Sequence, residues 1–82
     1  MTLTADRILT FLRDDLDVDT EGVELETALF SSGRVDSLAM VDLMAFLERE
    51  GRFHLDIADV TLENLDTVGR MLTLVAERAA RG

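Results

Sequence analysis

One serine in this sequence is placed where it could carry a covalent group. Ser37 follows Asp36 at the end of a loop that contains Gly33, and an apolar, acid-flanked segment with helical periodicity, residues 39–50, comes next. The first turn of a helix leaves backbone N–H groups free and holds the positive end of the helix dipole, and both favour an anion. Ser37 is therefore well placed to bear a phosphate ester.

The same residues allow a purely structural interpretation. Serine and aspartate are preferred helix N-cap residues, so Asp36 or Ser37 could simply start the helix. Taken alone, Ser37 favours this structural interpretation, and the surrounding residues must decide between the two.

The remaining residues offer no catalytic or metal-binding set. His54 is the only histidine and the chain has no cysteine, so neither a Ser-His-Asp triad nor a Cys/His metal site can be assembled convincingly. No glycine-rich phosphate loop is present. We expect no catalysis by this chain and no metal, and any thiol chemistry must use a borrowed thiol.

Length and charge limit the class of protein and of partner. The 82 residues predict one small domain spanning 1–82. Seventeen acidic residues against eight basic ones, all arginine, give a net charge of −9. This charge disfavours nucleic acid and anionic membranes and favours a basic protein surface. Because neither a signal peptide nor a membrane-spanning run is visible, we expect a soluble, cytoplasmic monomer.

Hydrophobic periodicity predicts an all-α fold, a small bundle of four helices with a short third helix. The expected helices are 4–16 capped by Thr4, 37–49 ended by a positive φ at Gly51, 61–65 capped by Thr61, and one from 66 or 67 onward. Residues 53–58 alternate like a strand, but an isolated strand has no hydrogen-bonding partner, so we interpret them as an extended loop.

The segment 17–36 is a long loop that must carry its own anchors to the core. We expect Val23, Leu25, Leu29 and Phe30 to pack inward, with a possible helical turn over 26–30. The apolar face of the last helix is predicted to consist of Val68, Met71, Leu72, Val75 and Ala79. The predicted core is Leu12, Leu29, Met44, Leu47, Leu55, Leu65, Val68 and Leu72.

The helix after Ser37 has apolar residues on the face that the core does not use. At about 100° per residue, one side holds the core positions, and the opposite side mixes apolar residues with acids. Taken alone, this second side favours ordinary surface, because scattered exposed apolar residues are normal.

The string from Leu29 to Leu38, continued by Val41-Asp42-Leu43 and Leu47-Glu48, resembles the acyl and peptidyl carrier protein family. The spacing to the later block Glu63–Val68 agrees with it, and the resemblance runs from about Leu25 to Val75. It implies that Ser37 receives 4'-phosphopantetheine from coenzyme A, and that Asp36 helps a phosphopantetheinyl transferase recognise the site. The terminal thiol of the arm would hold acyl or aminoacyl groups as thioesters. The resemblance also favours a partner-docking strip on the second side of the helix after Ser37, made of Leu38, Val41, Asp42, Ala45 and Glu48.

The implied function is that of a freestanding carrier. Its partners would be the transferase, an acyl- or aminoacyl-loading enzyme, and acyltransferases or synthases with basic docking surfaces. The sequence departs from fatty-acid carriers at Ala39, where an acid is frequent, at Gly51, where an aromatic is frequent, and at Asp56, where proline is usual. These departures favour polyketide or nonribosomal peptide biosynthesis over housekeeping fatty-acid synthesis, which remains the alternative. A second class of function is a noncatalytic acidic interaction module without a prosthetic group.

Overall fold

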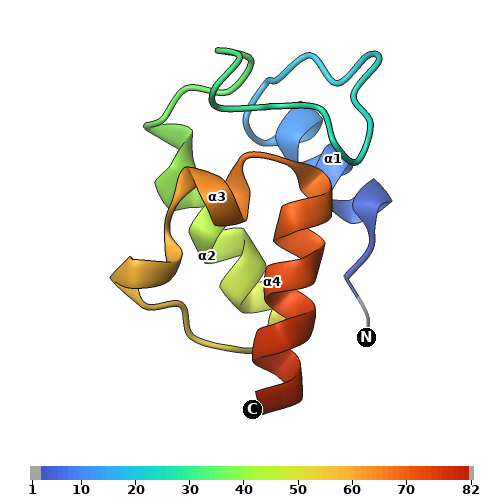
Figure 1. The fold of residues 1–82 in the computed structure, drawn as a ribbon. Coiled ribbons are helices and arrows are strands. Elements are labelled where there is room, and N and C mark those ends of the chain that lie inside the picture. The colour runs from blue at the N-terminus through green and yellow to red at the C-terminus, as the bar shows by residue number, and fades with distance from the viewer. Residues whose placement is uncertain (1–2, 82) are drawn as a thin grey trace.

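A computed structural model describes residues 3–81 and confirms the all-α prediction. Four helices form the fold: α1 (Ala5–Asp14), α2 (Ala39–Gly51), α3 (Leu62–Leu65) and α4 (Val68–Arg81) (Figure 1). A single 3-10 turn, Ile57–Asp59, precedes α3. Residues 53–56 are extended but pair with no strand, and none of the described residues is in a β-strand. The alternating segment is therefore a loop over 53–56, as predicted, but residues 57 and 58 belong to the 3-10 turn.

Helix α1 begins as its sequence predicts. The Thr4 side chain accepts a hydrogen bond from the Arg7 backbone N–H at 3.3 Å, and Asp6 lies in the first turn. Ile8 and Leu12 are fully buried, so this helix fixes one side of the core. Thr61 caps α3 in the same way, by accepting from the Asn64 backbone N–H at 3.2 Å.

The loop between α1 and α2 contains turns but no helix, so the helical turn suggested for 26–30 is not formed. Leu29 is fully buried, while Val23 and Phe30 are half-buried against the core. The expectation for Leu25 is wrong, because 51% of this residue is exposed. Its backbone is anchored instead, since its carbonyl accepts a hydrogen bond from the Gly69 N–H at 2.9 Å.

The predicted end of α2 needs a correction. Gly51 is still helical, and the left-handed residue is Arg52, with φ 55°. Gly51 is required for packing instead: a Cβ at this position would lie 2.5 Å from Cε1 of the Phe53 ring. The chain therefore folds Phe53 back onto the last turn of α2, where any larger side chain would force the ring to move.

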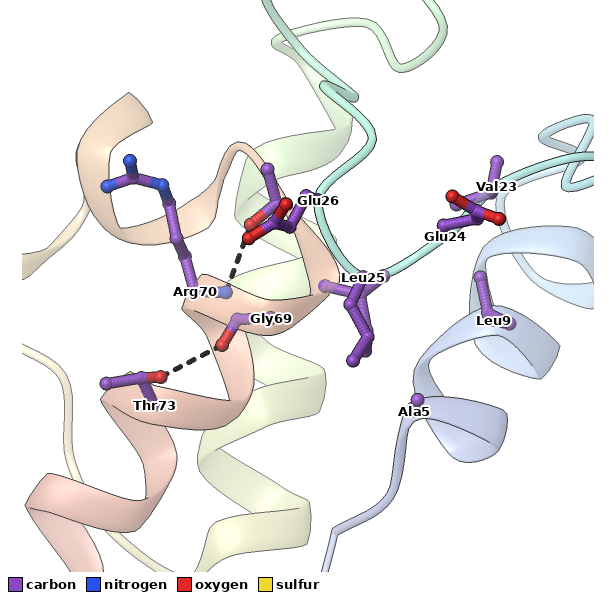
Figure 2. Close-up of a pocket in the computed structure, with 11 residues that line it drawn as sticks. Ala5, Leu9, Val23, Glu24, Leu25, Glu26, Gly69, Arg70 and Thr73 are labelled. Atoms are coloured by element: carbon purple, nitrogen blue, oxygen red, sulfur yellow. Dashed lines mark hydrogen bonds between the residues drawn. The ribbon is translucent and has the colours of Figure 1, made fainter.

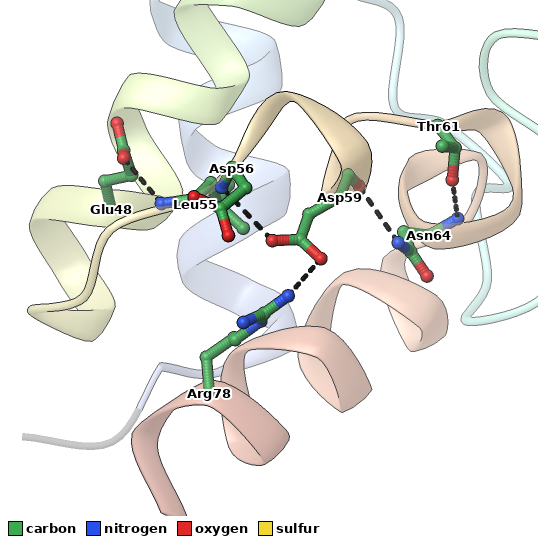
Figure 3. A network of polar contacts seen from close by, with 7 residues as sticks. All are labelled: Glu48, Leu55, Asp56, Asp59, Thr61, Asn64 and Arg78. Atoms are coloured by element: carbon green, nitrogen blue, oxygen red, sulfur yellow. Dashed lines mark hydrogen bonds and ion pairs between the residues drawn. The ribbon is translucent and has the colours of Figure 1, made fainter. Parts of the chain in front are cut away.

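Polar contacts hold the segment after α2 to two helices (Figure 3). On one side, the Glu48 carboxylate accepts a hydrogen bond from the Leu55 backbone N–H at 2.7 Å. On the other, the buried Asp59 forms an ion pair with Arg78 of α4 and also accepts from the Asp56 N–H at 3.1 Å. The extended loop and the 3-10 turn are thus fastened between α2 and α4.

The core combines residues from all four helices and the loops. Six of the eight predicted core residues are buried, but Met44 and Leu72 are only half-buried. On α4, the buried face includes Leu74, which lies on the other side of Met71 from the predicted Leu72. The predicted contributions of the Ile57 and Ala79 side chains lie outside the described residues. The buried apolar residues are Ile8, Leu12, Val18, Leu29, Val35, Leu43, Phe46, Leu47, Leu55, Leu65, Val68, Met71, Leu74 and Val75.

Candidate functional site

Ser37 lies on the surface, in the turn that leads into α2. Its side chain is exposed, and its hydroxyl makes no hydrogen bond with any residue that the structure describes. Val35, two positions earlier, is almost fully buried. The chain thus holds this turn by an apolar anchor and leaves the serine oxygen open to a reagent from solution.

The N-cap of α2 is Leu38, and no side chain caps this helix. Asp36, and not Ser37, holds the turn that precedes it. Its carboxylate accepts from the Leu38 N–H at 2.9 Å, and its carbonyl accepts from the Ala39 N–H at 2.9 Å. The Met40 N–H donates in turn to the Ser37 carbonyl at 3.1 Å. Helix α2 therefore starts at Ala39, not at Ser37, and fewer backbone N–H groups are free than the sequence predicted. The positive end of the helix dipole still stabilises an anion on Ser37.

The loop before Ser37 is docked on the junction between α3 and α4. The Asp66 carboxylate accepts from the backbone N–H groups of Phe30 and Ser31 at 2.8 and 2.9 Å, and from the Ser31 hydroxyl at 2.7 Å. The Leu29 N–H donates to the Asp66 carbonyl at 2.7 Å, and the Val35 N–H donates to the Leu29 carbonyl at 3.0 Å. Asp66 therefore positions the segment that carries Ser37.

Sequence reasoning missed this positioning role of Asp66, a residue that it used for the start of the last helix and within the block Glu63–Val68. The signals it had were an acid directly before α4 and Ser31 in the loop, and neither indicates the other as its partner. It also missed Val35 as a core residue. A single apolar residue between Arg34 and Asp36 was the available signal.

The electrostatics of Asp66 follow from these contacts. Partial burial opposes its ionisation, but the hydrogen bonds from Ser31, Phe30 and Leu29 outweigh that effect and lower the pKa of Asp66. A carboxyl group with a lowered pKa in the folded state stabilises the fold above its unfolded pKa, and this stability is lost as the pH falls through the folded pKa.

We expect Asp66→Asn to lower the free energy of unfolding at neutral pH by about 1 kcal/mol, because hydrogen bonds to a charged acceptor are stronger than those to a neutral one. The difference from the parent should shrink as the pH falls below about 4, where the unfolded aspartate becomes protonated. Urea unfolding followed by circular dichroism between pH 7 and 3 measures it. Asp42→Asn, at an exposed carboxylate, is the control and should change little. A deficit for Asp66→Asn that stays constant with pH would contradict this role.

The predicted docking strip is largely on the surface. Leu38 is 82% and Val41 65% exposed, and Asp42 and Ala45 are also exposed. Glu48 differs from these four, because it is half-buried and its carboxylate already binds the Leu55 N–H and the His54 ring at 3.1 Å. The structure thus gives Glu48 a role in the fold and leaves the other four residues accessible next to Ser37.

No catalytic arrangement surrounds these residues. His54 is exposed and contacts Glu48 rather than a nucleophile. Within residues 3–81, no group of three or more His, Cys, Asp or Glu side chains could hold a metal ion. None of the described helices is both long and apolar enough to cross a membrane.

Comparison with known proteins gives consistent matches. The family described as "Phosphopantetheine attachment site" matches residues 6–75. An acyl carrier protein of Picosynechococcus sp. is 37% identical over 73 residues, which cover 89% of this chain and 88% of that protein. The probable acyl carrier protein PigG of Serratia sp. is 35% identical over 60 residues, covering 73% and 69%. An acyl carrier protein of Phytoplasma australiense is 28% identical over 78 residues, covering 95% and 100%.

Proposed function

This chain belongs to the acyl and peptidyl carrier protein family, whose members are noncatalytic and carry covalent 4'-phosphopantetheine, and on that premise we propose that Ser37 bears the group. The observation that carries the proposal is the Ser37 hydroxyl, which is exposed and unbonded at the start of α2. The other two serine hydroxyls of the same loop, on Ser31 and Ser32, both donate hydrogen bonds within the fold. Among the serines of this loop, only Ser37 has an oxygen that is available without breaking such a bond.

The residues at the site fit the attached group. The phosphate would sit at the positive end of the α2 dipole, and the exposed position of Ser37 leaves room for a flexible arm. In the attachment step, the Ser37 oxygen bonds to the phosphorus of the phosphopantetheine half of coenzyme A. The bond between the two phosphates breaks, the nucleotide half leaves, and the hydroxyl proton passes to a base of the transferase. Asp36 holds the turn in place through its hydrogen bonds to Leu38 and Ala39.

The experiment that tests the proposal is intact-protein mass spectrometry. The apo protein incubated with coenzyme A and a broad-specificity phosphopantetheinyl transferase should gain the mass of one phosphopantetheinyl group. Fragmentation should place that mass on the peptide containing Ser37. A carrier that gained no mass, or gained it on another peptide, would refute the assignment.

Once attached, the arm supplies a thiol that holds an acyl group as a thioester. The chain's own residues position Ser37 and present the surface that partners recognise. The family membership leaves no support for the alternative of an acidic module without a prosthetic group.

We infer that the cargo belongs to a specialised pathway of polyketide or nonribosomal peptide biosynthesis, with fatty-acid synthesis as the alternative. Two of the three departures from fatty-acid carriers have structural accounts. The Phe53 ring fills the space beside Gly51, and the Asp56 N–H, which proline would lack, donates to Asp59. Ala39 therefore carries the inference, because it removes an acid from the turn after Ser37. If a fatty-acid malonyl transferase loaded the holo protein as fast as a fatty-acid carrier, the alternative would hold.

The strip formed by Leu38, Val41, Asp42 and Ala45 is proposed as the surface that basic partners contact. We expect Asp42→Arg to slow modification by the transferase several-fold more than Glu21→Arg, although both reverse one exposed charge. Only Asp42 lies on the helix that presents Ser37. Raising the salt concentration should reduce this difference, because exposed charges are screened over about 10 Å at 0.1 M.

Initial rates of mass gain measure this prediction, and Val41→Asp tests the apolar half of the strip. Its loss of rate should persist at high salt, because the contact is not ionic. Equal slowing by Asp42→Arg and Glu21→Arg would show that only the general field of the protein matters and that α2 is not the docking surface.

A further inference from the structure

An open hollow lies between α1 and α4, beneath the loop that joins α1 to α2 (Figure 2). Its volume is about 970 Å³ and it is open to solvent. Apolar residues from all three elements line it: Ala5 and Leu9 of α1, Val23 of the loop and Val68 of α4. None of the residues that line it belongs to the docking strip, so this hollow is a separate surface.

Leu25 stands at the edge of this hollow with its backbone fixed and its side chain exposed. The Gly69 N–H donates to the Leu25 carbonyl at 2.9 Å. Helix and loop approach so closely there that a Cβ on Gly69 would lie 3.1 Å from the carbonyl oxygen. Yet 51% of Leu25 remains exposed. The fold thus holds an apolar side chain in place without using it in the core.

The edge of the hollow around Leu25 is acidic. Glu24 and Glu26 flank Leu25 and are exposed, and among the described residues neither carboxylate takes part in an ion pair or a hydrogen bond. Arg70 is the one cation among the described residues that line the hollow. Its guanidinium donates to the Glu63 carbonyl at 2.8 Å and points away from Leu25 in Figure 2. A ligand at Leu25 therefore meets apolar surface bordered by unpaired negative charge.

We propose that this hollow docks an amphipathic helix of a partner protein, one that places a leucine-like side chain against Leu25 and arginine or lysine side chains against Glu24 and Glu26. Charge complementarity selects this occupant. A second copy of this chain would bring its own net charge of −9 and be repelled, and the same charge disfavours an anionic lipid surface. The docking does not involve the prosthetic group, so a partner held here would leave Ser37 accessible to another enzyme.

The proposal can be tested on protein that cannot be modified. Isotope-labelled Ser37→Ala protein is titrated with a synthetic helical peptide in which leucine is flanked by arginines one turn away on each side. Saturable shifts are expected at the amides of Leu9, Leu25 and Gly69, which border the hollow. The same peptide with serine in place of its leucine is the control and should bind at least about ten-fold more weakly, because the buried apolar contact is lost.

A matched pair of variants ties the binding to the hollow. Leu25 and Leu62 are 51% and 50% exposed, but only Leu25 borders the hollow. Leu25→Ser should weaken peptide binding by about ten-fold, and Leu62→Ser should leave it unchanged. Because both side chains are largely exposed, neither variant should lose its fold, which thermal unfolding checks. Replacing Glu24 and Glu26 by glutamine should weaken binding and reduce its dependence on salt.

Three results would overturn the proposal: shifts that cluster around Ser37 and Val41, equal weakening by Leu25→Ser and Leu62→Ser, or no saturable shift at millimolar peptide. None of them bears on the attachment of phosphopantetheine, because Ser37 is absent from the protein used. Conversely, a failed mass gain on the parent protein would leave the peptide result standing.

Discussion

Replacement of Ser37 by alanine should abolish the attachment of phosphopantetheine and leave the fold unchanged. The alanine variant has no oxygen to attack the phosphate, so it should gain no mass under conditions that convert the parent completely. Its thermal midpoint should match that of the parent, because the Ser37 hydroxyl is exposed and makes no hydrogen bond to a described residue.

Two neighbouring serines provide the matched controls. The Ser31 hydroxyl donates to Asp66 at 2.7 Å, and the Ser32 hydroxyl donates to the Ala28 carbonyl at 2.6 Å. Ser31→Ala and Ser32→Ala should therefore keep the mass gain but lower the free energy of unfolding by about 1 kcal/mol each. A mass gain that persists in Ser37→Ala and disappears in either control would place the attachment site elsewhere in the loop.

The second large effect is expected in the core. Leu47 of α2 is fully buried, so Leu47→Ala should lower the free energy of unfolding by roughly 2 to 5 kcal/mol. The free energy of unfolding of native domains is only about 5 to 15 kcal/mol, so the variant would be close to unfolding at physiological temperature. Urea unfolding followed by circular dichroism measures the change.

Leu72→Ala is the comparison for Leu47→Ala. Leu72 is also a helical leucine, but it is only half-buried, at the edge of the buried face of α4. Its truncation should cost less than half as much. If both variants lost the same stability, the packing of α4 described above would be wrong.

The starts of α1 and α3 were the most predictable part of the fold. Thr4 and Thr61 were identified as caps from sequence, and both accept the expected hydrogen bond from the residue three positions later. Such a signal is local, so it survives whatever the rest of the chain does. The end of α2 was less predictable, because the close contact of Gly51 with the Phe53 ring depends on how the following loop turns back.

Hydrophobic periodicity did not fully predict which residues of α4 are buried. The predicted face included Leu72, whereas Leu74 is buried on the opposite side of Met71. A single apolar stripe assumes that a helix packs in one direction, but α4 contacts α1, α2 and α3. Arg78 lies on the same side as Leu74 and pairs there with Asp59, so this side of the helix is covered as well.

In the candidate site, too, a role that depends on neighbours in sequence was predictable, and a role that depends on distant contacts was not. Ser37 was found from its neighbours in sequence. The role of Asp66 was not, because its partners Phe30 and Ser31 lie 36 and 35 residues away. Glu48 was placed on the docking strip by its helical angle, and its contact with the Leu55 N–H, across the end of α2, could not be read from that angle.

The dependence of the Ser37 loop on Asp66 also orders events during protein synthesis. A ribosome makes the serine well before it makes the aspartate that holds the loop, so a growing chain exposes Ser37 on a segment with no fixed support. Only after α3 and the start of α4 have emerged can Leu29, Phe30 and Ser31 find their acceptors. For a transferase that recognises the docked loop, we therefore expect priming to follow translation, so that truncated or misfolded chains consume no coenzyme A.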